Sequence, residues 1–480
     1  MSHNNFLQAL TEERSNDEIV IKKYAGIRKT LTDLYPDKAH FIYELMQNAE
    51  DASASEITFN LDSGKLIIEH NGSRLFNEKD VRSITDIGDS SKSNDNTSIG
   101  KFGVGFKAVF SYTNTPIVYS DDFSFRIRDL IVPEQVEQIN DKKGKTIFEF
   151  PFNNPKKPAA LAVSEIDKGL CALGDNTLLF LSHIRKISYS LPDGSQGSLE
   201  RIDHENGRIE IRAKHPHSEE TVSNWLHFHK DVEVTDSESN RKKCRVAIAY
   251  QLEKVTEKNK NSENWKIIPI QGGGQVSIYF PAEKETSKLR FHIHAPFAST
   301  VARDSVRDCD DNKQLRDHLA DLITESLSVI RDQKMLVMSF LAVLPNAKDE
   351  LAEFYEPIRE KIVHQFQYSD LTPTKNGDYF SACFLYRSSS TISNLINDED
   401  LKLLVNKSHK YTDNDSQALM NKVANDAAWV ANAPQRYSSR EDNFLDSLGI
   451  KTWSFEQLSE IFASANREKT ESWIETKDDD

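Results

Sequence analysis

Residues 99–110 read Ile-Gly-Lys-Phe-Gly-Val-Gly-Phe-Lys-Ala-Val-Phe, a glycine-rich stretch that runs directly into an apolar helical pattern. Gly100, Gly103 and Gly105 give it the form G-x-x-G-x-G. A glycine loop that opens a helix leaves backbone N–H groups free at the positive end of the helix dipole, which favours anion binding. Tight packing would explain the same pattern. It is not a dinucleotide-binding fingerprint, because that motif needs a strand where the polar residues 86–98 stand.

Glycine is scarce in the rest of the chain, which makes this concentration informative. Only 18 of the 480 residues are glycine, and six of these lie between Gly64 and Gly105. Apolar residues at 38% and charged residues at 28% exclude low-complexity, collagen-like and membrane-embedded classes, and the length suggests two to four domains. The net charge of −15 does not indicate nucleic-acid binding, although it leaves room for a local basic patch.

Cysteine usage and hydropathy bear on the compartment of the protein. The four cysteines are scattered without paired spacing, so we expect neither a disulfide framework nor a cysteine zinc site. The same pattern predicts a cytoplasmic location. No basic segment followed by an apolar core marks a secretory signal at the N-terminus. The longest apolar stretch, Met335 to Leu344, is too short to span a bilayer, and we expect no membrane association.

A predicted helix upstream of the glycine loop carries an acidic face. Asp37 is a plausible N-cap, and Glu44, Asn48 and Asp51 recur at helical spacing. A carboxylate can accept a proton from an attacking water, and an amide oxygen one turn away can ligate Mg²⁺. An ordinary solvated helix face is the alternative. The opposite, apolar stripe consists of Phe41, Ile42, Leu45, Met46, Ala49 and Ala52.

Two strands are predicted between the acidic helix and the glycine loop. Residues 55–61 and 65–70 alternate in hydropathy and are joined by the turn residues 62–64. Asn71-Gly72 then forms a second turn signature. The order is therefore an acidic helix, two strands, a glycine turn, a polar loop and the glycine-rich stretch.

Taken together, these motifs resemble the GHKL ATPase superfamily, which includes gyrase, the large heat-shock chaperones, histidine kinases and MutL. The resemblance rests on residues 44–52, Glu-Leu-Met-Gln-Asn-Ala-Glu-Asp-Ala, and on residues 99–106. Within the superfamily, the sacsin-type branch is similar in its Asn71-Gly72 turn, in residues 87–92, Ile-Gly-Asp-Ser-Ser-Lys, and in residues 102–107. The match covers roughly residues 40 to 150 and implies a Bergerat-type α/β sandwich.

The resemblance implies roles for individual residues. Glu44 would activate the attacking water and Asn48 would ligate Mg²⁺, with ATP as the nucleotide. The segment from about Ile84 to Ser98 would form a lid over the nucleotide. Thr146, which precedes a strand at 147–150, would reach the adenine pocket. The other implied nucleotide-binding positions are Asp51, Asn71, Gly72, Ser90, Ser91, Lys92, Gly100, Lys101, Phe102, Gly103, Val104, Gly105 and Phe106.

One departure from the family pattern concerns the adenine site. The family carries aspartate in D-x-G-x-G, whereas residues 70–74 here read His-Asn-Gly-Ser-Arg. His70 therefore replaces the aspartate that contacts the adenine amino group, and Arg74 replaces the second glycine. A neutral imidazole could accept from the amino group, or Asp51 or a water could substitute.

Two further patterns resemble ligand sites, but each lacks a residue that such a site would need. Gly144-Lys145-Thr146 lacks the earlier glycine of a P-loop, since Ile139 stands there, and a strand is predicted to follow it. Three His-x-His pairs could each place two rings on one strand face, but no third ligand is near any of them. We therefore expect strand histidines without structural zinc. The pairs are His215/His217, His227/His229 and His292/His294.

The predicted fold class is α+β, in three parts. A Bergerat-type ATP-binding domain, with a mixed sheet covered by helices, is expected at residues 1–186. A mixed α/β, transducer-like domain is expected at 187–345, and a mainly helical region at 346–480. In such ATPases a second-domain residue often reaches the γ-phosphate, and Arg303 and Arg307 are the candidates, with surface ion pairs as the alternative. Strands are predicted at 186–191, 208–213, 246–252, 276–280 and 289–294, and helices at 159–173 and 313–344.

Two functions follow from the motifs and the resemblance. The first is a Mg²⁺-dependent ATPase that uses lid closure and domain rearrangement to act on a protein partner or a second copy of itself. The second is a nucleotide-sensing or chaperone-like module with little hydrolysis. The resemblance also suggests bacterial antiviral defence as one setting. Histidine-kinase and topoisomerase activities are not expected, because no phospho-acceptor helix is recognisable and the chain is too short for a tyrosine domain.

Overall fold

The chain forms two compact units in the computed structural model, which describes residues 3–23, 41–86, 106–139, 144–235, 241–255, 264–299, 305–407, 427–435 and 437–464. Unit 1 comprises Met1–Ala249, Gln275–Glu285 and His292–Leu315. Unit 2 comprises Tyr250–Gly274, Thr286–Phe291 and Arg316–Asp480. The three-part division drawn from the sequence stays a prediction.

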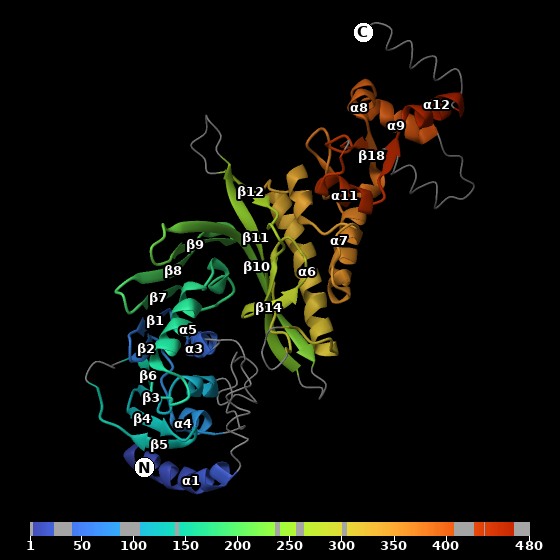
Figure 1. Cartoon of the computed structure of the whole chain (residues 1–480). Helices are drawn as coiled ribbons and strands as arrows, with labels where there is room; N and C mark the ends of the chain where they lie inside the picture. The colour runs from blue at the N-terminus through green and yellow to red at the C-terminus, as the bar shows by residue number, and fades with distance from the viewer. Residues whose placement is uncertain are drawn as a thin grey trace. The chain divides into compact units, whose positions relative to one another are not determined.

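Unit 1 is built on one large mixed sheet (Figure 1). The strand order is β14-β13-β15-β11-β10-β9-β8-β7-β1-β2-β6-β3-β4-β5, and β11 continues into unit 2, where it pairs with β12. The strands of this order are β1 (Glu56–Leu61), β2 (Lys65–His70), β3 (Ile117–Ser120), β4 (Phe123–Arg128), β5 (Val132–Gln135), β6 (Thr146–Pro151), β7 (Lys186–Ser190), β8 (Gln196–Asp203), β9 (Arg208–Lys214), β10 (Thr221–Thr235), β11 (Arg241–Val255), β13 (Gln275–Ile278), β14 (Phe280–Thr286) and β15 (His292–His294).

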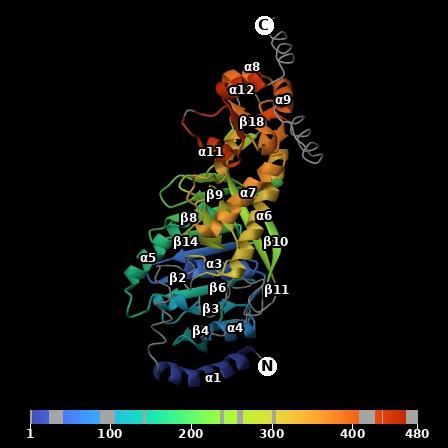
Figure 2. The same cartoon turned by 90° about the vertical axis from the view of Figure 1, so that its right-hand side faces the viewer.

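Helices cover this sheet, which confirms the predicted α+β class with a mixed sheet under helices. In two perpendicular views, α3, α4 and α5 lie on the same side of the β1–β6 part, and α1 lies beside β5 (Figures 1 and 2). The helices of unit 1 are α1 (His3–Lys23), α3 (Phe41–Asp51), α4 (Glu78–Ile84) and α5 (Ala159–Cys171), with short 3₁₀ turns η1 (Phe106–Ser111), η2 (Asp175–Thr177) and η3 (Glu205–Gly207).

The hydropathy patterns explain the pairing at the centre of the sheet. Alternate residues of β1 and β2 are buried, and Asp62 accepts hydrogen bonds from the backbone N–H groups of Gly64 and Lys65 in the turn between them. β1 also pairs in parallel with β7. Consequently β7, β8 and β9, which the sequence assigned to a second domain, continue the same sheet as the predicted nucleotide-binding domain.

Unit 2 is mainly helical and carries two small sheets that the sequence analysis did not predict. β16 pairs with β17, and β18 lies between β19 and β20. The elements that lie wholly or mostly in unit 2 are β12 (Asn264–Ile268), α6 (Asp310–Asp332), η4 (Met338–Val343), η5 (Glu353–Tyr355), α7 (Glu356–Tyr368), β16 (Thr372–Pro373), β17 (Tyr379–Phe380), η6 (Ala382–Phe384), β18 (Leu385–Ser388), α8 (Ser390–Leu395), α9 (Asp398–Lys407), β19 (Ala428–Trp429), α11 (Arg440–Ser447), β20 (Lys451–Trp453) and α12 (Phe455–Ser464).

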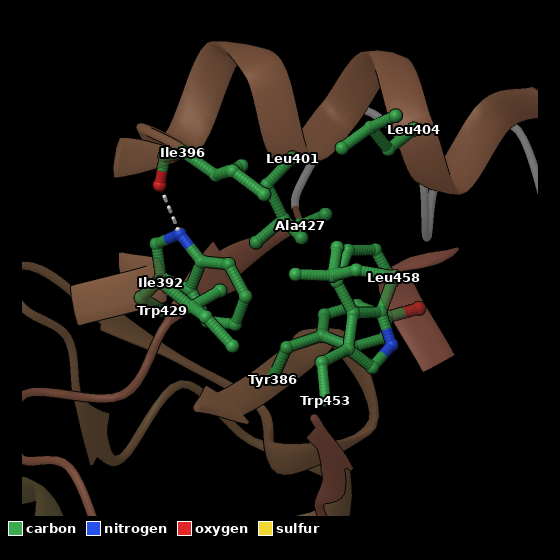
Figure 3. Close-up of a cluster of buried hydrophobic side chains, with 9 residues drawn as sticks. All are labelled: Tyr386, Ile392, Ile396, Leu401, Leu404, Ala427, Trp429, Trp453 and Leu458. Atoms are coloured by element: carbon green, nitrogen blue, oxygen red, sulfur yellow. Dashed lines mark hydrogen bonds between the residues drawn. The ribbon is translucent and has the colours of Figure 1, made fainter. Parts of the chain in front are cut away.

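The C-terminal part of unit 2 has its own apolar core. Figure 3 shows Trp429 and Trp453 packed among aliphatic side chains from α8, α9 and α12, with the Trp429 indole donating to the Ile396 carbonyl oxygen. Because an indole N–H needs a partner when buried, this bond lets the ring enter the core without an unsatisfied donor.

No helix in the described part of the chain is long and apolar enough to cross a bilayer.

Two helices of unit 2 show how local sequence sets where a helix begins and ends. The long helix predicted over 313–344 is wrong in its C-terminal third, because α6 ends at Asp332 and Lys334 takes a left-handed backbone conformation with φ of 60°. Helix α12 begins with a capping box at Ser454. Ser454 N–H donates to the Gln457 side chain, and Gln457 N–H donates to the Ser454 hydroxyl.

Candidate nucleotide-binding site

Helix α3 places Glu44 and Asn48 in the interior of unit 1. The apolar stripe predicted from the sequence is buried as expected, which fixes the helix against the sheet. Glu44 and Asn48 are only 4% and 7% exposed, so they do not form a solvated helix face. Asp51, at the last position of α3, is half-buried. A carboxylate and an amide are therefore held inside the protein one helical turn apart.

A row of three polar side chains crosses the strands next to α3. His70 lies opposite Thr146 in the β2–β6 pair, and Thr146 lies opposite Ser120 in the β6–β3 pair. Residues opposite one another in a sheet share a face, so the three side chains line up. All three are buried, and the hydroxyls of Ser120 and Thr146 are 2.7 Å apart. Ser120 had no sequence signal, because only strand pairing brings it to Thr146.

The hydrogen bond of His70 determines which ring nitrogen carries its proton. Burial lowers the pKa of His70 to about 4, so the imidazole is neutral at pH 7. Its Nδ1 accepts a 3.2 Å hydrogen bond from Gly72 N–H. The proton therefore resides on Nε2, which makes this nitrogen a donor. Of the alternatives left by the sequence, acceptance of an amino group by His70 is not supported by this geometry.

The turn after His70 depends on Gly72 and Asn71 for different reasons. A Cβ on Gly72 would lie 2.7 Å from Ala52 Cβ and 2.8 Å from the Ala52 carbonyl oxygen, so only glycine fits without displacement. The Asn71 amide is used in the α3–β1 turn, where its oxygen accepts from Ser55 and Glu56 N–H at 2.9 and 3.0 Å. Asn71 thus holds the turn, and its predicted nucleotide contact stays a prediction.

The segment after the glycine loop begins with Phe106 and Lys107. It forms the 3₁₀ helix η1 rather than the predicted α-helix, and the Phe106 ring packs on Phe148 and Phe150. Lys107, to which the sequence analysis gave no role, is 1% exposed. Its ammonium donates to the carbonyl oxygens of Ile84 and Leu130 at 2.7 and 2.6 Å. Burial lowers the pKa of Lys107 to about 7.

Several predicted site residues lie outside the described residues, and the structure says nothing of them. Arg307 is described and exposed, and its N–H donates to the Ala298 carbonyl oxygen at 3.0 Å. Its predicted reach to the γ-phosphate stays a prediction. The predicted positions outside the described ranges are Asp37, Ser90, Ser91, Lys92, Gly100, Lys101, Phe102, Gly103, Val104, Gly105 and Arg303.

The histidine pairs lie on strands or next to them, and two of these rings have backbone partners. His292 and His294 are buried on β15, where their Nδ1 atoms accept from the N–H groups of Gln275 and Tyr279. Within the described ranges, no group of three or more histidine, cysteine, aspartate or glutamate side chains could hold a metal ion.

The mixed sheet under helices, with Glu44 and Asn48 buried on α3 beside the His70–Thr146 row, is the arrangement that the GHKL resemblance implied. Residues 22–148 match the Sacsin domain family. This match confirms the sacsin-type resemblance for that part of the chain.

Known proteins with similar sequences are much longer than this chain. It is 23% identical to Protein NO VEIN of Arabidopsis thaliana over 66% of this chain and 12% of that protein. It is 25% identical to Sacsin of Homo sapiens over 57% of this chain and 8% of that protein. The matched part is thus a small share of either relative.

Solved structures give weaker matches. An N-terminal domain of a DNA repair protein aligns with a TM-score of 0.37 at 10% identity, covering 65% of this chain and 99% of that one. The B-subunit of DNA gyrase from Myxococcus xanthus aligns with a TM-score of 0.36 at 11% identity, covering 63% and 95%.

Proposed function

We propose that unit 1 binds ATP with Mg²⁺ and hydrolyses it slowly. The observation that carries the proposal is the burial of Glu44 and Asn48 one turn apart on α3. Burying a carboxylate or an amide costs free energy unless it is hydrogen-bonded, so such a pair inside a domain is a candidate for a functional role. The sacsin-type domain at residues 22–148 supports the same reading.

The described residues fit a magnesium ion. The Asn48 side-chain oxygen is the kind of hard ligand that Mg²⁺ prefers, and the ion would take its other ligands from water and phosphate. When bound, it would neutralise negative charge on the phosphate chain. Asn48 would hold the ion, and Glu44, on the same face of α3, would orient the attacking water and accept its proton.

The row across β2, β6 and β3 supports a place for the base. His70 would offer its Nε2 hydrogen to a ring nitrogen of adenine. Thr146 and Ser120 share a hydrogen bond and still have acceptor capacity for an amino group. In this arrangement the hydroxyls replace the aspartate of the family pattern. Adenine recognition then rests on Thr146 and Ser120 more than on His70.

The experiment is ATP hydrolysis by the full chain and by Glu44→Gln, with Glu78→Gln as the matched control. Glu78 is an exposed residue of α4, so its variant should hydrolyse ATP at the wild-type rate. We expect Glu44→Gln to lose about 100-fold or more in kcat while still binding ATP. Equal rates for wild type and Glu44→Gln would refute catalysis by Glu44. Absence of ATP binding to the wild type would refute the whole proposal.

A nucleotide-sensing module with little hydrolysis is the second candidate, favoured by the His70 substitution. ATP binding without turnover in both wild type and Glu44→Gln would select it. In either case we propose that nucleotide binding regulates a protein partner or a second copy of the chain through lid closure and domain rearrangement. A role in antiviral defence rests on the family resemblance.

A further inference from the structure

A pocket of about 230 Å³ lies within unit 1, over strands β8 to β11. The strand order separates β8 from β2 by three strand spacings, or roughly 14 Å at about 4.8 Å each. The lining of the pocket includes residues of the 180–185 loop, which precedes β7. It includes none of the nucleotide-site residues. It is smaller than the roughly 300–1,000 Å³ of pockets for drug-sized ligands, so its volume suits a small ion or group.

The charged residues of the pocket wall are four arginines and one aspartate: Arg185, Arg201, Arg208, Arg245 and Asp203. Asp203 is shared, since it bonds Arg185 Nε at 2.7 Å and Arg201 Nη2 at 2.8 Å. One carboxylate on the wall therefore serves two guanidinium groups. The wall itself therefore has more guanidinium groups than carboxylates.

Carboxylates behind the wall offset part of this charge. Arg245 makes a two-point contact with Asp231 at 2.7 and 3.2 Å, and Arg208 lies 3.6 Å from Glu210. These partners hold the arginines in place. They do not close the pocket, because neither Asp231 nor Glu210 lines it.

Burial makes the excess charge costly. The Arg201 side chain is only 8% exposed, and three of its hydrogen bonds go to neutral carbonyl oxygens of residues 178, 179 and 181. His227 Nε2, on β10, is buried and has no hydrogen-bond partner among the described residues. A buried ring nitrogen without a partner is uncommon and points to a bound group or water.

A glycine of the pocket wall, Gly207, lies directly against the backbone of His227. Gly207 has φ of 77°, and a Cβ there would lie 2.9 Å from the His227 carbonyl oxygen. Both the backbone conformation and the close approach therefore require glycine. The backbone of η3 can in this way pass directly against β10 at the pocket.

We propose that this pocket is a second ligand site of unit 1, which binds a phosphate-class oxyanion through its arginines. Guanidinium groups present paired N–H donors that match the oxygens of phosphate, and four of them converge here from three strands and a loop. The proposal stands independently of ATP hydrolysis, because none of its residues belongs to the nucleotide site.

Calorimetric titration of the full chain with pyrophosphate, in chloride buffer at constant ionic strength, tests the site. We expect about one equivalent to bind. The double variant Arg185→Gln/Arg245→Gln, made at the two most exposed arginines of the wall, should weaken binding about ten-fold or more. Asp203→Asn should tighten it, because Arg185 and Arg201 then have no competing carboxylate.

Two controls separate this site from other sources of phosphate binding. Arg212→Gln removes an exposed arginine of β9 that does not line the pocket, and Asn48→Ala alters the nucleotide site. Both should bind pyrophosphate like the wild type. Loss of binding in Asn48→Ala but not in the double variant would overturn the proposal, as would equal weakening by Arg212→Gln or no binding to the wild type at millimolar concentration.

A second probe distinguishes a free ion from a phosphate group carried on an organic molecule. Glycerol 3-phosphate presents one phosphate group on a small carbon chain. Binding of both probes, each weakened by the double variant, identifies a carried phosphate group as an acceptable ligand. Binding of pyrophosphate alone restricts the site to the free ion. If neither probe responds to the double variant, the arginines serve the fold alone and the proposal fails.

Discussion

The two polar regions of unit 1 are built on one sheet in opposite ways. Around β2, β6 and β3, the described side chains aimed at the candidate nucleotide site are neutral or acidic, and its phosphate-binding element is assigned to a glycine-rich backbone. Over β8 to β11, arginine side chains provide the charge directly. The contrast indicates two solutions for anions on one scaffold. The first would use backbone N–H groups at a helix start, and the second would use guanidinium groups held by shared carboxylates.

Glu50 connects the two regions, and its removal should have the largest effect on stability. Its carboxylate, 2% exposed at the end of α3, accepts from the N–H groups of Ser182, His183 and Ile184 at 2.6, 2.9 and 2.9 Å. Ser182 lines the arginine pocket. We expect Glu50→Ala to lower the free energy of unfolding by about 3 kcal/mol, because charged hydrogen bonds are lost and a buried donor is left unpaired.

Chemical denaturation measures this loss, and Glu56→Ala is the control. Glu56 begins β1 and is exposed, so its variant should change stability by less than about 0.5 kcal/mol. The stability of Glu50→Gln should lie between those of the two alanine variants, since an amide retains one acceptor oxygen. Equal stability of Glu50→Ala and Glu56→Ala would show that the hydrogen bonds from residues 182–184 to Glu50 contribute nothing to the free energy of unfolding.

Alanine at Gly72 and Gly207, two turn glycines that leave no room for a Cβ, should separate the two regions. The Cβ added by Gly72→Ala would clash with Ala52. The Cβ added by Gly207→Ala would clash with the His227 carbonyl oxygen, and the backbone φ of residue 207 is unfavourable for alanine. Each should cost about 1–3 kcal/mol of stability, because packed backbone must move. Gly72→Ala should weaken ATP binding and leave pyrophosphate binding intact, and Gly207→Ala should do the reverse.

Gly64→Ala is the control for both, since its Cβ would have only Asp62 Oδ1 nearby, at 3.6 Å. Thermal unfolding and separate titrations with ATP and pyrophosphate check the pattern. If both glycine variants weakened the same ligand, the two regions would be one site.

The sequence allowed the first region to be predicted far better than the second. The stripe of α3 and strands β1, β2 and β6 follow from local periodicity and spacing, which also put Glu44 and Asn48 on one face of α3. Ser120 could not be predicted, because it meets Thr146 only through the pairing of β3 with β6. The arginine pocket has no motif for the same reason.

Strands β8 and β10, which carry part of the pocket, were themselves missed. β10 has many polar and charged residues along its length, so its hydropathy does not alternate clearly. The net charge of −15 left room for a local basic patch without locating it. Long-range strand pairing decides the position of the pocket, and it cannot be derived from local pattern.

The most gradual expected effect is a pH dependence from Lys107, which lies between α4 and the β4–β5 turn. Its pKa is about 7 in the folded protein and near 10.5 when unfolded, because burial disfavours the charged form. Between these values the unfolded chain binds a proton that the folded chain does not. Raising the pH from 7 towards 10 therefore stabilises the fold, by at most about 1.4 kcal/mol per pH unit from this group.

Lys107→Met removes the titration and isolates this contribution. The variant loses two hydrogen bonds to the Ile84 and Leu130 carbonyl oxygens, so it should be less stable than the wild type at pH 9. The difference in stability between the two proteins should narrow as the pH falls to 7. At that pH only the wild type buries a charge, which costs free energy. Urea unfolding of both proteins at pH 7, 8 and 9 measures the gap. A gap that is constant across this range would show that Lys107 keeps an ordinary pKa, and that the nucleotide-site region buries a full positive charge as the arginine pocket does.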